Sequence, residues 1–270
     1  MPELAEVEYM LRRWDAGAGE PITRVETHAR ARVFRATAAA TLVRTLSGGA
    51  PAAGLRTGKQ MLFRIEPRGW LGLHLGMTGE LRVEPASYPM AKHDHLVLRQ
   101  ERRTLVFSDP RMFGRIAWTP GAEPPAWWTG RPPEILEQGF TATRMRAFLA
   151  RRARAPIKAV VLMQEMFPGI GNWMADEALW RAHIHPARTA GSLGPREHSA
   201  LFRALRFVCR GALETVARGD PSGGWADPPK GWLFHQRWAE GGTCPVSGVP
   251  LVRQTIGGRT TCWSPAVQKR

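Results

Sequence analysis

Cysteine is scarce in this chain, and the three that occur form no recognisable framework. Cys209, Cys244 and Cys262 are an odd number in 270 residues, and their spacing matches no disulfide pattern. A few unpaired cysteines are typical of proteins in a reducing compartment. We therefore expect a cytoplasmic location.

Long apolar runs and a secretory leader pattern are also missing. No stretch is long enough to span a bilayer, and the amino terminus lacks the basic-then-apolar order of a signal peptide. We expect neither export nor a membrane partner. The hydrophobic fraction of 43% still suffices for a packed core, and 270 residues suggest one large or two ordinary domains.

Lysine is rare, whereas positive charge is abundant. Only five lysines occur among 38 cationic residues, against 23 acidic residues, for a net charge of +15. Such an excess attracts polyanions, and we expect nucleic acid to be the partner. The alternative is a basic, solvated surface in an arginine-rich proteome. That alternative explains why arginine is used in place of lysine, but it does not explain why basic residues outnumber acidic ones.

The first eight residues include groups that could take part in catalysis. After removal of Met1, Pro2 would be a secondary amine with a reference pKa of about 8, able to attack an electrophilic carbon and form an iminium. Glu3 and Glu6 lie three apart, on one face of a predicted helix, where they can move protons or balance charge. The alternative is an ordinary helix start, since proline and acids are favoured there.

Hydrophobic spacing predicts two halves of different type. Residues 2–15 have helical periodicity, and residues 22–118 read as short strands of a sandwich or barrel. Leu96–Leu98 and Leu105–Phe107 lie on either side of the polar segment Gln100–Arg103, which predicts a hairpin. Residues 119–140 are rich in proline and predict a linker.

The second half is predicted to be helical. Thr141 can cap one helix, Pro156 can open a second, and Pro195 can open a long one that reaches about residue 218. The helix after Pro156 breaks at residues 168–172, a glycine-rich turn that feeds another helix. Such a turn can offer N–H groups to a phosphate, although a plain packing turn is the commoner case.

Three polar loops interrupt the predicted strands: Gly58–Gln60, His74–Gly79 and Asp109–Gly114. The second holds Met77 and the third holds Arg111 and Phe113. An exposed apolar side chain on such a loop can wedge into a base stack, and an adjacent arginine can hydrogen-bond an unpaired base. The alternative is that Met77 and Phe113 are ordinary core residues.

Together these motifs resemble the formamidopyrimidine-DNA glycosylase/endonuclease VIII family. The motifs follow the order of the family nearly from end to end: residues 1–8 come first, then the three loops, and then a helix–two-turn–helix element over Gln164–Pro186. Leu4 and the pair Arg111 and Phe113 favour the formamidopyrimidine branch. The resemblance implies an α+β fold, with an N-terminal helix and antiparallel β-sandwich at 1–118, a linker at 119–140, a helix–two-turn–helix domain at 141–231 and a β-hairpin finger at 232–270.

The resemblance also implies residue roles. Pro2 would be the nucleophile, Glu3 the acid/base group, Glu6 a structural or proton-handling partner, and Lys59 a phosphate-holding residue of the catalytic centre. Met77 and Phe113 would fill the gap left by an everted nucleotide, and Arg111 would read the orphaned base. The residues expected to contact DNA are His74, Met77, Arg111, Phe113, Lys158, Asn172 and Arg259.

The carboxyl-terminal finger departs from the family pattern. Of four expected zinc-ligand positions only Cys244 holds cysteine, and Ser247, Ser264 and Val267 hold the others. These groups cannot make a structural zinc site, which needs four nitrogen or sulfur ligands. We therefore predict a zincless finger that needs no cofactor and is held by packing of aromatic residues: Trp232, Phe234, Trp238 and Trp263.

The resulting hypothesis is a monomeric, bifunctional DNA glycosylase/AP lyase that removes oxidised or ring-opened purines from duplex DNA with a damaged base or abasic site. In a bacterium it would be nucleoid-associated. One alternative is an endonuclease VIII-like preference for oxidised pyrimidines, and another is a non-catalytic module that binds damaged DNA. The loop over residues 220–225 is expected to cover the everted base, but nothing in its residues names that base.

Overall fold

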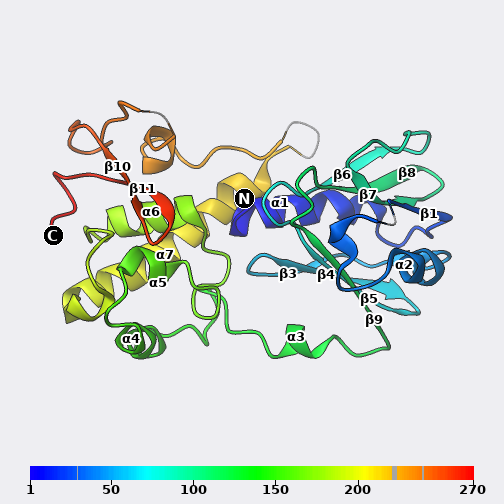
Figure 1. Ribbon diagram of the computed structural model, residues 1–270, viewed down its shortest axis with the longest axis horizontal. Coiled ribbons are helices and arrows are strands. Elements are labelled where there is room, and N and C mark those ends of the chain that lie inside the picture. Colours follow the sequence, from blue (N-terminus) through cyan, green and yellow to red (C-terminus); the bar gives the residue numbers. More distant parts are fainter. Residues whose placement is uncertain (29, 221–223, 239) are drawn as a thin grey trace. The chain divides into compact units, whose positions relative to one another are not determined.

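The computed structural model describes residues 1–28, 30–220, 224–238 and 240–270, and the chain divides into two compact units (Figure 1). The first comprises residues 1–2, 6–131 and 220–225, and the second comprises 3–5, 132–219 and 226–270. The change of unit after residue 131 falls inside the segment predicted as a linker. The finer division into four parts stays a prediction.

The first helix, α1 (Leu4–Trp14), has the predicted amphipathic pattern. Val7, Met10, Leu11 and Trp14 are all less than 5% exposed, at the spacing that places side chains on one helical face. A 3-10 turn, η1 (Asp15–Gly17), follows directly after the helix.

Two antiparallel sheets make up most of the first unit. One has the order β1 (Arg24–Thr27), β7 (Asp94–Arg99), β8 (Arg103–Ser108), β6 (Glu80–Pro85). The other has the order β2 (Ala50–Pro51), β4 (Gln60–Glu66), β5 (Gly69–His74), β9 (Arg115–Pro120), with β3 (Leu55–Thr57) paired to β4.

The two sheets share one hydrophobic core, so the predicted sandwich is confirmed. Phe63 and Leu73 from one sheet and Leu98 and Phe107 from the other belong to the same buried cluster. The predicted hairpin is also confirmed, since Leu98 pairs with Leu105 across β7 and β8. Alternation along each strand sends every second side chain into this core.

A helix within residues 22–118 was missed. α2 (Ala39–Leu46) lies in the region that the sequence predicted to be strands throughout. Its Ala39, Leu42 and Leu46 are buried at helical spacing, a signal that its β-branched residues obscured. Two further short helices are η2 (Arg32–Phe34) and α3 (Ala126–Thr129), the latter within the proline-rich segment.

The second unit is mainly helical, with a two-stranded hairpin near its end. Its elements are α4 (Ala142–Arg151), α5 (Ile157–Val161), α6 (Asn172–Arg181), η3 (Ala190–Ser192), α7 (Pro195–Thr215), η4 (Val216–Arg218), η5 (Leu233–Gln236), β10 (Val252–Ile256) and β11 (Arg259–Trp263). The predicted cap is present, because the Thr141 hydroxyl accepts a 3.1 Å hydrogen bond from the Arg144 N–H. Pro156 and Pro195 stand at the starts of α5 and α7, as predicted.

No helix in the described ranges combines the length and apolar character that a membrane crossing requires.

Candidate functional site

Glu3 is fixed by the amino-terminal end of α6, within the second unit. Its carboxylate accepts hydrogen bonds from three backbone N–H groups, those of Gly171 (3.0 Å), Trp173 (3.0 Å) and Met174 (3.1 Å). The side chain is only 3% exposed. Helix starts leave N–H groups without partners and favour negative charge, so this carboxylate is held in one orientation.

The close approach of Glu3 requires glycine at position 171. A Cβ atom there would lie 2.2 Å from the Glu3 carboxyl carbon, far inside van der Waals contact. The sequence left open whether this glycine-rich turn offers N–H groups to a phosphate or is a plain packing turn. The N–H groups of Gly171, Trp173 and Met174 bind the protein's own carboxylate.

Asn172 and the finger hairpin meet in the second unit. The Asn172 side-chain N–H donates to the Thr260 carbonyl at 2.7 Å, directly after Arg259 in the chain. Arg259 is exposed and follows the turn made by Gly257 (φ 58°) and Gly258 (φ 75°). Two consecutive positive φ values define a tight hairpin turn that favours glycine. The arginine is thus presented at the hairpin tip, where it can reach a phosphate.

Lys158 does not fit the predicted DNA contact. Its side chain is fully buried, and its ammonium donates to the Asn172 carbonyl at 2.7 Å and to Asp176 at 2.5 Å. A phosphate cannot reach this group in the described conformation. The prediction of a DNA contact at Lys158 is therefore corrected to an internal ion pair.

Lys59 and His74 lie close together in the first unit. β4 follows Lys59 directly and pairs with β5 so that Gln60 faces His74. The His74 Nδ1 accepts a 3.0 Å hydrogen bond from the Gly76 N–H, which leaves the proton on Nε2. Burial, with nearby Arg115 and Lys59, lowers the pKa of His74 to about 4. At neutral pH this side chain is therefore an uncharged donor.

Met77, Arg111 and Phe113 sit on two adjoining loops of the first unit. Phe113 is 39% exposed, Arg111 is exposed and Met77 is half-buried. The Arg111 guanidinium lies 4.8 Å from the centre of the Phe113 ring. These positions differ from those of core residues, so the side chains are available to a partner.

Other expected residues lie as follows. Pro2 is half-buried and Glu6 is 8% exposed, both within the first unit. In the loop 220–225, Pro221, Ser222 and Gly223 lie outside the described residues. The part that is described is tied to α1, since the Tyr9 hydroxyl donates to the Asp220 carbonyl at 2.8 Å and the Trp225 ring stands edge-on to Tyr9.

The four positions aligned with zinc ligands gather in the finger. Burial would raise the pKa of the Cys244 thiol, but the neighbouring Ser247 and Ser264 hydroxyls and nearby backbone N–H groups lower it to about 6. Val267 packs on the same small apolar cluster as Cys244. One sulfur, two hydroxyls and a methyl-bearing side chain do not fit a structural zinc ion.

The finger is held in part by the aromatic packing that the sequence predicts, because Trp232 is 4% exposed in the core of the second unit and the Phe234 ring stands edge-on to Trp173 at 5.1 Å between centroids. Trp238 is 57% exposed, whereas Trp263 contacts the His185 ring at 4.2 Å between centroids. Polar contacts also attach the finger: the Cys262 N–H donates to Asp176 at 3.1 Å, and the Gln268 side chain donates to the Ile184 carbonyl at 2.9 Å. Asp176 is thus a residue that sequence reasoning missed.

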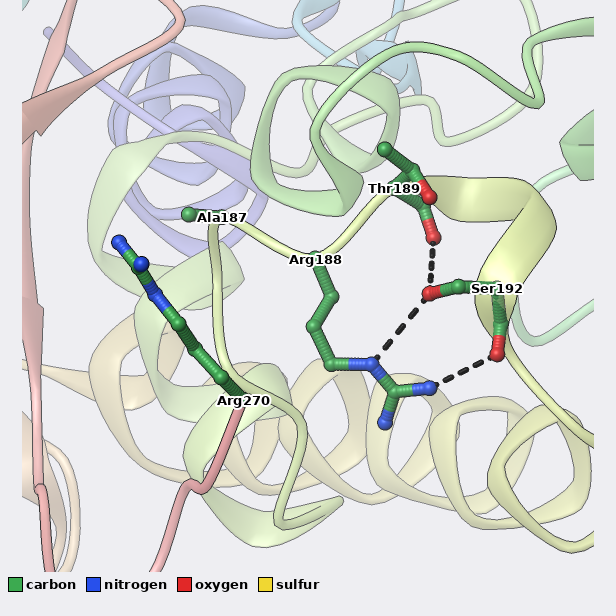
Figure 2. Close-up of a pocket in the computed structure, with 5 residues that line it drawn as sticks. All are labelled: Ala187, Arg188, Thr189, Ser192 and Arg270. Carbon is green, nitrogen blue, oxygen red and sulfur yellow. Dashed lines mark hydrogen bonds between the residues drawn. The ribbon is translucent and has the colours of Figure 1, made fainter.

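A pocket of about 670 Å³ in the second unit is lined by Arg188 and Arg270 (Figure 2). Its arginines would suit an anion, but the Arg188 guanidinium is already bound to Glu197 and to Ser192. That ion pair neutralises the charge on one wall. We do not count this pocket among the phosphate contacts.

Comparison with known proteins extends these observations. The family profile described as the formamidopyrimidine-DNA glycosylase N-terminal domain matches residues 1–116, and the profile described as the formamidopyrimidine-DNA glycosylase H2TH domain matches residues 132–220. The formamidopyrimidine-DNA glycosylase of Geobacter sulfurreducens is 36% identical over all of both chains. That of Thermus thermophilus is 37% identical over 99% of this chain and 98% of its own.

Solved structures give the same result. The wild-type Lactococcus lactis Fpg (MutM) in complex with N7-benzyl-Fapy-dG containing DNA matches over all of both chains, with a TM-score of 0.87 and 26% identity. The L. lactis Fpg in complex with abasic-site DNA matches over 99% of this chain and all of that one, with a TM-score of 0.88 and 26% identity. Sequence, fold and motif order agree, and this chain belongs to the formamidopyrimidine-DNA glycosylase family.

Proposed function

We propose that this chain is a bifunctional DNA glycosylase/AP lyase of base excision repair that acts on oxidised or ring-opened purines in duplex DNA. The observation that carries the proposal is the Glu3 carboxylate, fixed by three N–H groups of α6 one residue after Pro2. A carboxylate is held in place next in sequence to a potential amine nucleophile. Fpg-named relatives of full length support the substrate class.

The reaction begins with eversion of the damaged nucleotide, because its sugar carbon is inaccessible in the stacked duplex. Eversion costs a few kcal/mol of unstacking. Met77 and Phe113 fill the vacated space, and Arg111 hydrogen-bonds the orphaned base. These three side chains offset part of the cost by replacing lost stacking and pairing.

Chemistry follows at the everted sugar. After Met1 has been removed, the Pro2 nitrogen attacks C1′, the damaged base leaves, and an iminium forms. Glu3 moves protons during opening of the sugar. The iminium withdraws electrons, so the C2′ proton is lost and the 3′ phosphate is eliminated, which cuts the strand. Glu6 supports this centre.

Phosphate contacts come from both units. In the first, Lys59 supplies charge and His74 an uncharged Nε2 donor, which its low pKa of about 4 preserves at neutral pH. In the second, Asn172 and Arg259 supply contacts from the start of α6 and the hairpin tip. We further propose that the protein acts as a monomer in the cytoplasm, at the nucleoid of a bacterium, with catalytic, linker, helix–two-turn–helix and finger parts at 1–118, 119–140, 141–231 and 232–270.

A borohydride trapping assay tests the proposal. Duplexes with one defined lesion each, including an oxidised purine, a ring-opened purine, an oxidised pyrimidine and an abasic site, are incubated with the enzyme and reductant. We expect nicking and a covalent adduct at the amino-terminal peptide, with the purine lesions preferred. Pro2→Gly should weaken trapping greatly, and protein that retains Met1 should not trap.

Peptide mapping of the adduct separates the alternatives. The chain has only five lysines, so an adduct on Lys59 would be identified without ambiguity and would refute the role of Pro2. Binding without nicking or trapping on any duplex would support the non-catalytic module instead. If the oxidised pyrimidine is excised faster than the purine lesions, the enzyme has an endonuclease VIII-like substrate preference.

A further inference from the structure

The carboxylate of Asp109 joins two loops that are far apart in sequence. It is fully buried, and its Oδ1 accepts a hydrogen bond from the Thr78 hydroxyl at 2.6 Å. Its Oδ2 accepts from the Gly114 N–H at 2.7 Å, and Oδ1 also accepts from the Arg111 N–H at 3.3 Å. Thr78 follows Met77, while Arg111 and Gly114 bracket Phe113. One side chain therefore connects both loops.

The backbones of the two loops are also in direct contact at Gly76. A Cβ atom on Gly76 would lie 2.5 Å from the Gly114 nitrogen and 2.5 Å from the Phe113 carbonyl carbon. Gly76 has a φ of +65°, so both its conformation and its surroundings favour glycine. Loops packed this closely cannot shift independently over any appreciable distance.

Asp109 is itself anchored to the sheet. Its N–H donates to the His93 carbonyl at 3.0 Å, and its carbonyl lies 3.0 Å from the His95 Nε2. Arg35 holds the second loop from another side, donating to the Gly114 carbonyl at 2.7 Å and to the Phe113 carbonyl at 3.2 Å. The coupled loops are thus attached to the rigid core of the first unit.

We propose that Asp109 is a positioning residue that holds Met77 in register with Arg111 and Phe113, so that the three side chains enter the DNA together. The inference rests on the proposed function, because it concerns the eversion step of that reaction. Asp109 touches no reacting atom. It acts by keeping the two loops in one fixed arrangement before DNA binds, which avoids ordering them during eversion.

Two substitutions test the coupling with little change in volume. Asp109→Asn replaces one carboxylate oxygen with an N–H donor, so the backbone N–H of either Arg111 or Gly114 loses its acceptor. Thr78→Val removes only the hydroxyl that bridges to the other loop. Glu101→Gln is the matched control, because Glu101 is an exposed acidic residue in the turn between β7 and β8 of the same unit.

The first readout compares two reactions. Misplacement of the loops should slow release of a damaged base by about 100-fold in Asp109→Asn, the scale expected for a displacement near 1 Å. Loss of one hydrogen bond in Thr78→Val should slow it by about 10-fold. Incision at a preformed abasic site should change much less, since no base has to be everted. The double variant should be no slower than Asp109→Asn alone.

The second readout does not depend on catalysis. A duplex with a tetrahydrofuran abasic analogue and an adjacent 2-aminopurine should change fluorescence when the three side chains enter the stack. The change should be as large in Glu101→Gln as in wild type, and it should be smaller in Thr78→Val and smallest in Asp109→Asn. If wild type excises nothing but this pattern holds, the proposed function fails and the coupling stands.

Three results would overturn the coupling. One is normal excision and fluorescence in Thr78→Val and Asp109→Asn. Another is strictly multiplicative slowing in the double variant, which would mean that the residues act independently. The third is equal slowing of base release and abasic incision together with a large fall in melting temperature, which would assign Asp109 a purely structural role.

Discussion

The ammonium of Lys158 lies 2.5 Å from the Oδ1 of Asp176, and both side chains are buried in the second unit. The other carboxylate oxygen of Asp176 accepts from Arg237 at 2.7 Å and from the Cys262 N–H at 3.1 Å. Asp176 therefore links α5, the segment after η5 and strand β11. Burial lowers the pKa of Lys158, whereas the adjacent Asp176 carboxylate opposes that change.

Lys158→Met should destabilise the protein without altering its salt-dependent DNA binding. Removing one partner of a buried ion pair leaves the other charge poorly compensated, at a cost of about 3–5 kcal/mol. Denaturant unfolding measures this cost. The exposed Lys230→Met is the control and should stay within about 0.5 kcal/mol of wild type. If Lys158→Met unfolds at the same denaturant concentration as wild type but has a smaller salt slope of DNA binding, then Lys158 contacts DNA and this prediction is wrong.

The purified protein should hold no stoichiometric zinc, and its activity should not respond to chelators. The ligand positions hold one thiol, two hydroxyls and a valine, which do not bind zinc as a structural site. Elemental analysis and an assay with and without chelator give the test. Cys244→Ser should retain activity. One zinc per chain, lost together with activity in that variant, would mean that the finger has been aligned wrongly.

Arg259→Ala should weaken binding to all duplex sequences and reduce the salt slope by about 0.9, the value for one lost phosphate contact. Asn172→Ala should weaken binding without that change in slope, because its side chain is neutral and already donates to the Thr260 carbonyl. Arg253→Ala, on the same hairpin but away from its tip, is the control. Equal slopes for all three variants and wild type would place Arg259 away from the phosphates.

Glu3→Gln should abolish base release and leave DNA affinity nearly intact. The amide keeps one acceptor oxygen where the carboxylate has two, although three N–H groups need acceptors. We therefore also expect about 1–3 kcal/mol of destabilisation from unsatisfied donors. Single-turnover base release, binding titration and denaturant unfolding are measured together. Base release at the wild-type rate would exclude Glu3 as the acid/base group.

His74 should make folding stability sensitive to acid. Its pKa of about 4 in the folded protein lies below the unfolded value of about 6.5, so the unfolded chain binds the proton first. The contribution of His74 is complete above pH 6.5 and is lost as the pH falls towards 4. His74→Gln should show a smaller loss of unfolding free energy between pH 7 and pH 5 than wild type does.

The sequence by itself determined the family, the order of a mainly β half and a mainly helical half, and many local features. The Thr141 cap, the hairpin that pairs Leu98 with Leu105 and the helix opened by Pro195 follow from residue type and spacing over a few positions. The motifs also identified Glu3, Met77, Arg111 and Phe113 as candidate site residues. Such signals are local, so they survive without knowledge of the rest of the fold.

Only the tertiary structure decided what these residues touch. The bonds from Gly171, Trp173 and Met174 to Glu3 span about 170 positions, and the Asp109 connection between two loops spans 31. Lys158 looks like any surface cation in sequence, yet it is buried because Asp176 compensates its charge. Whether a polar side chain faces solvent or a partner depends on distant segments that pack around it, and residue spacing carries no record of them.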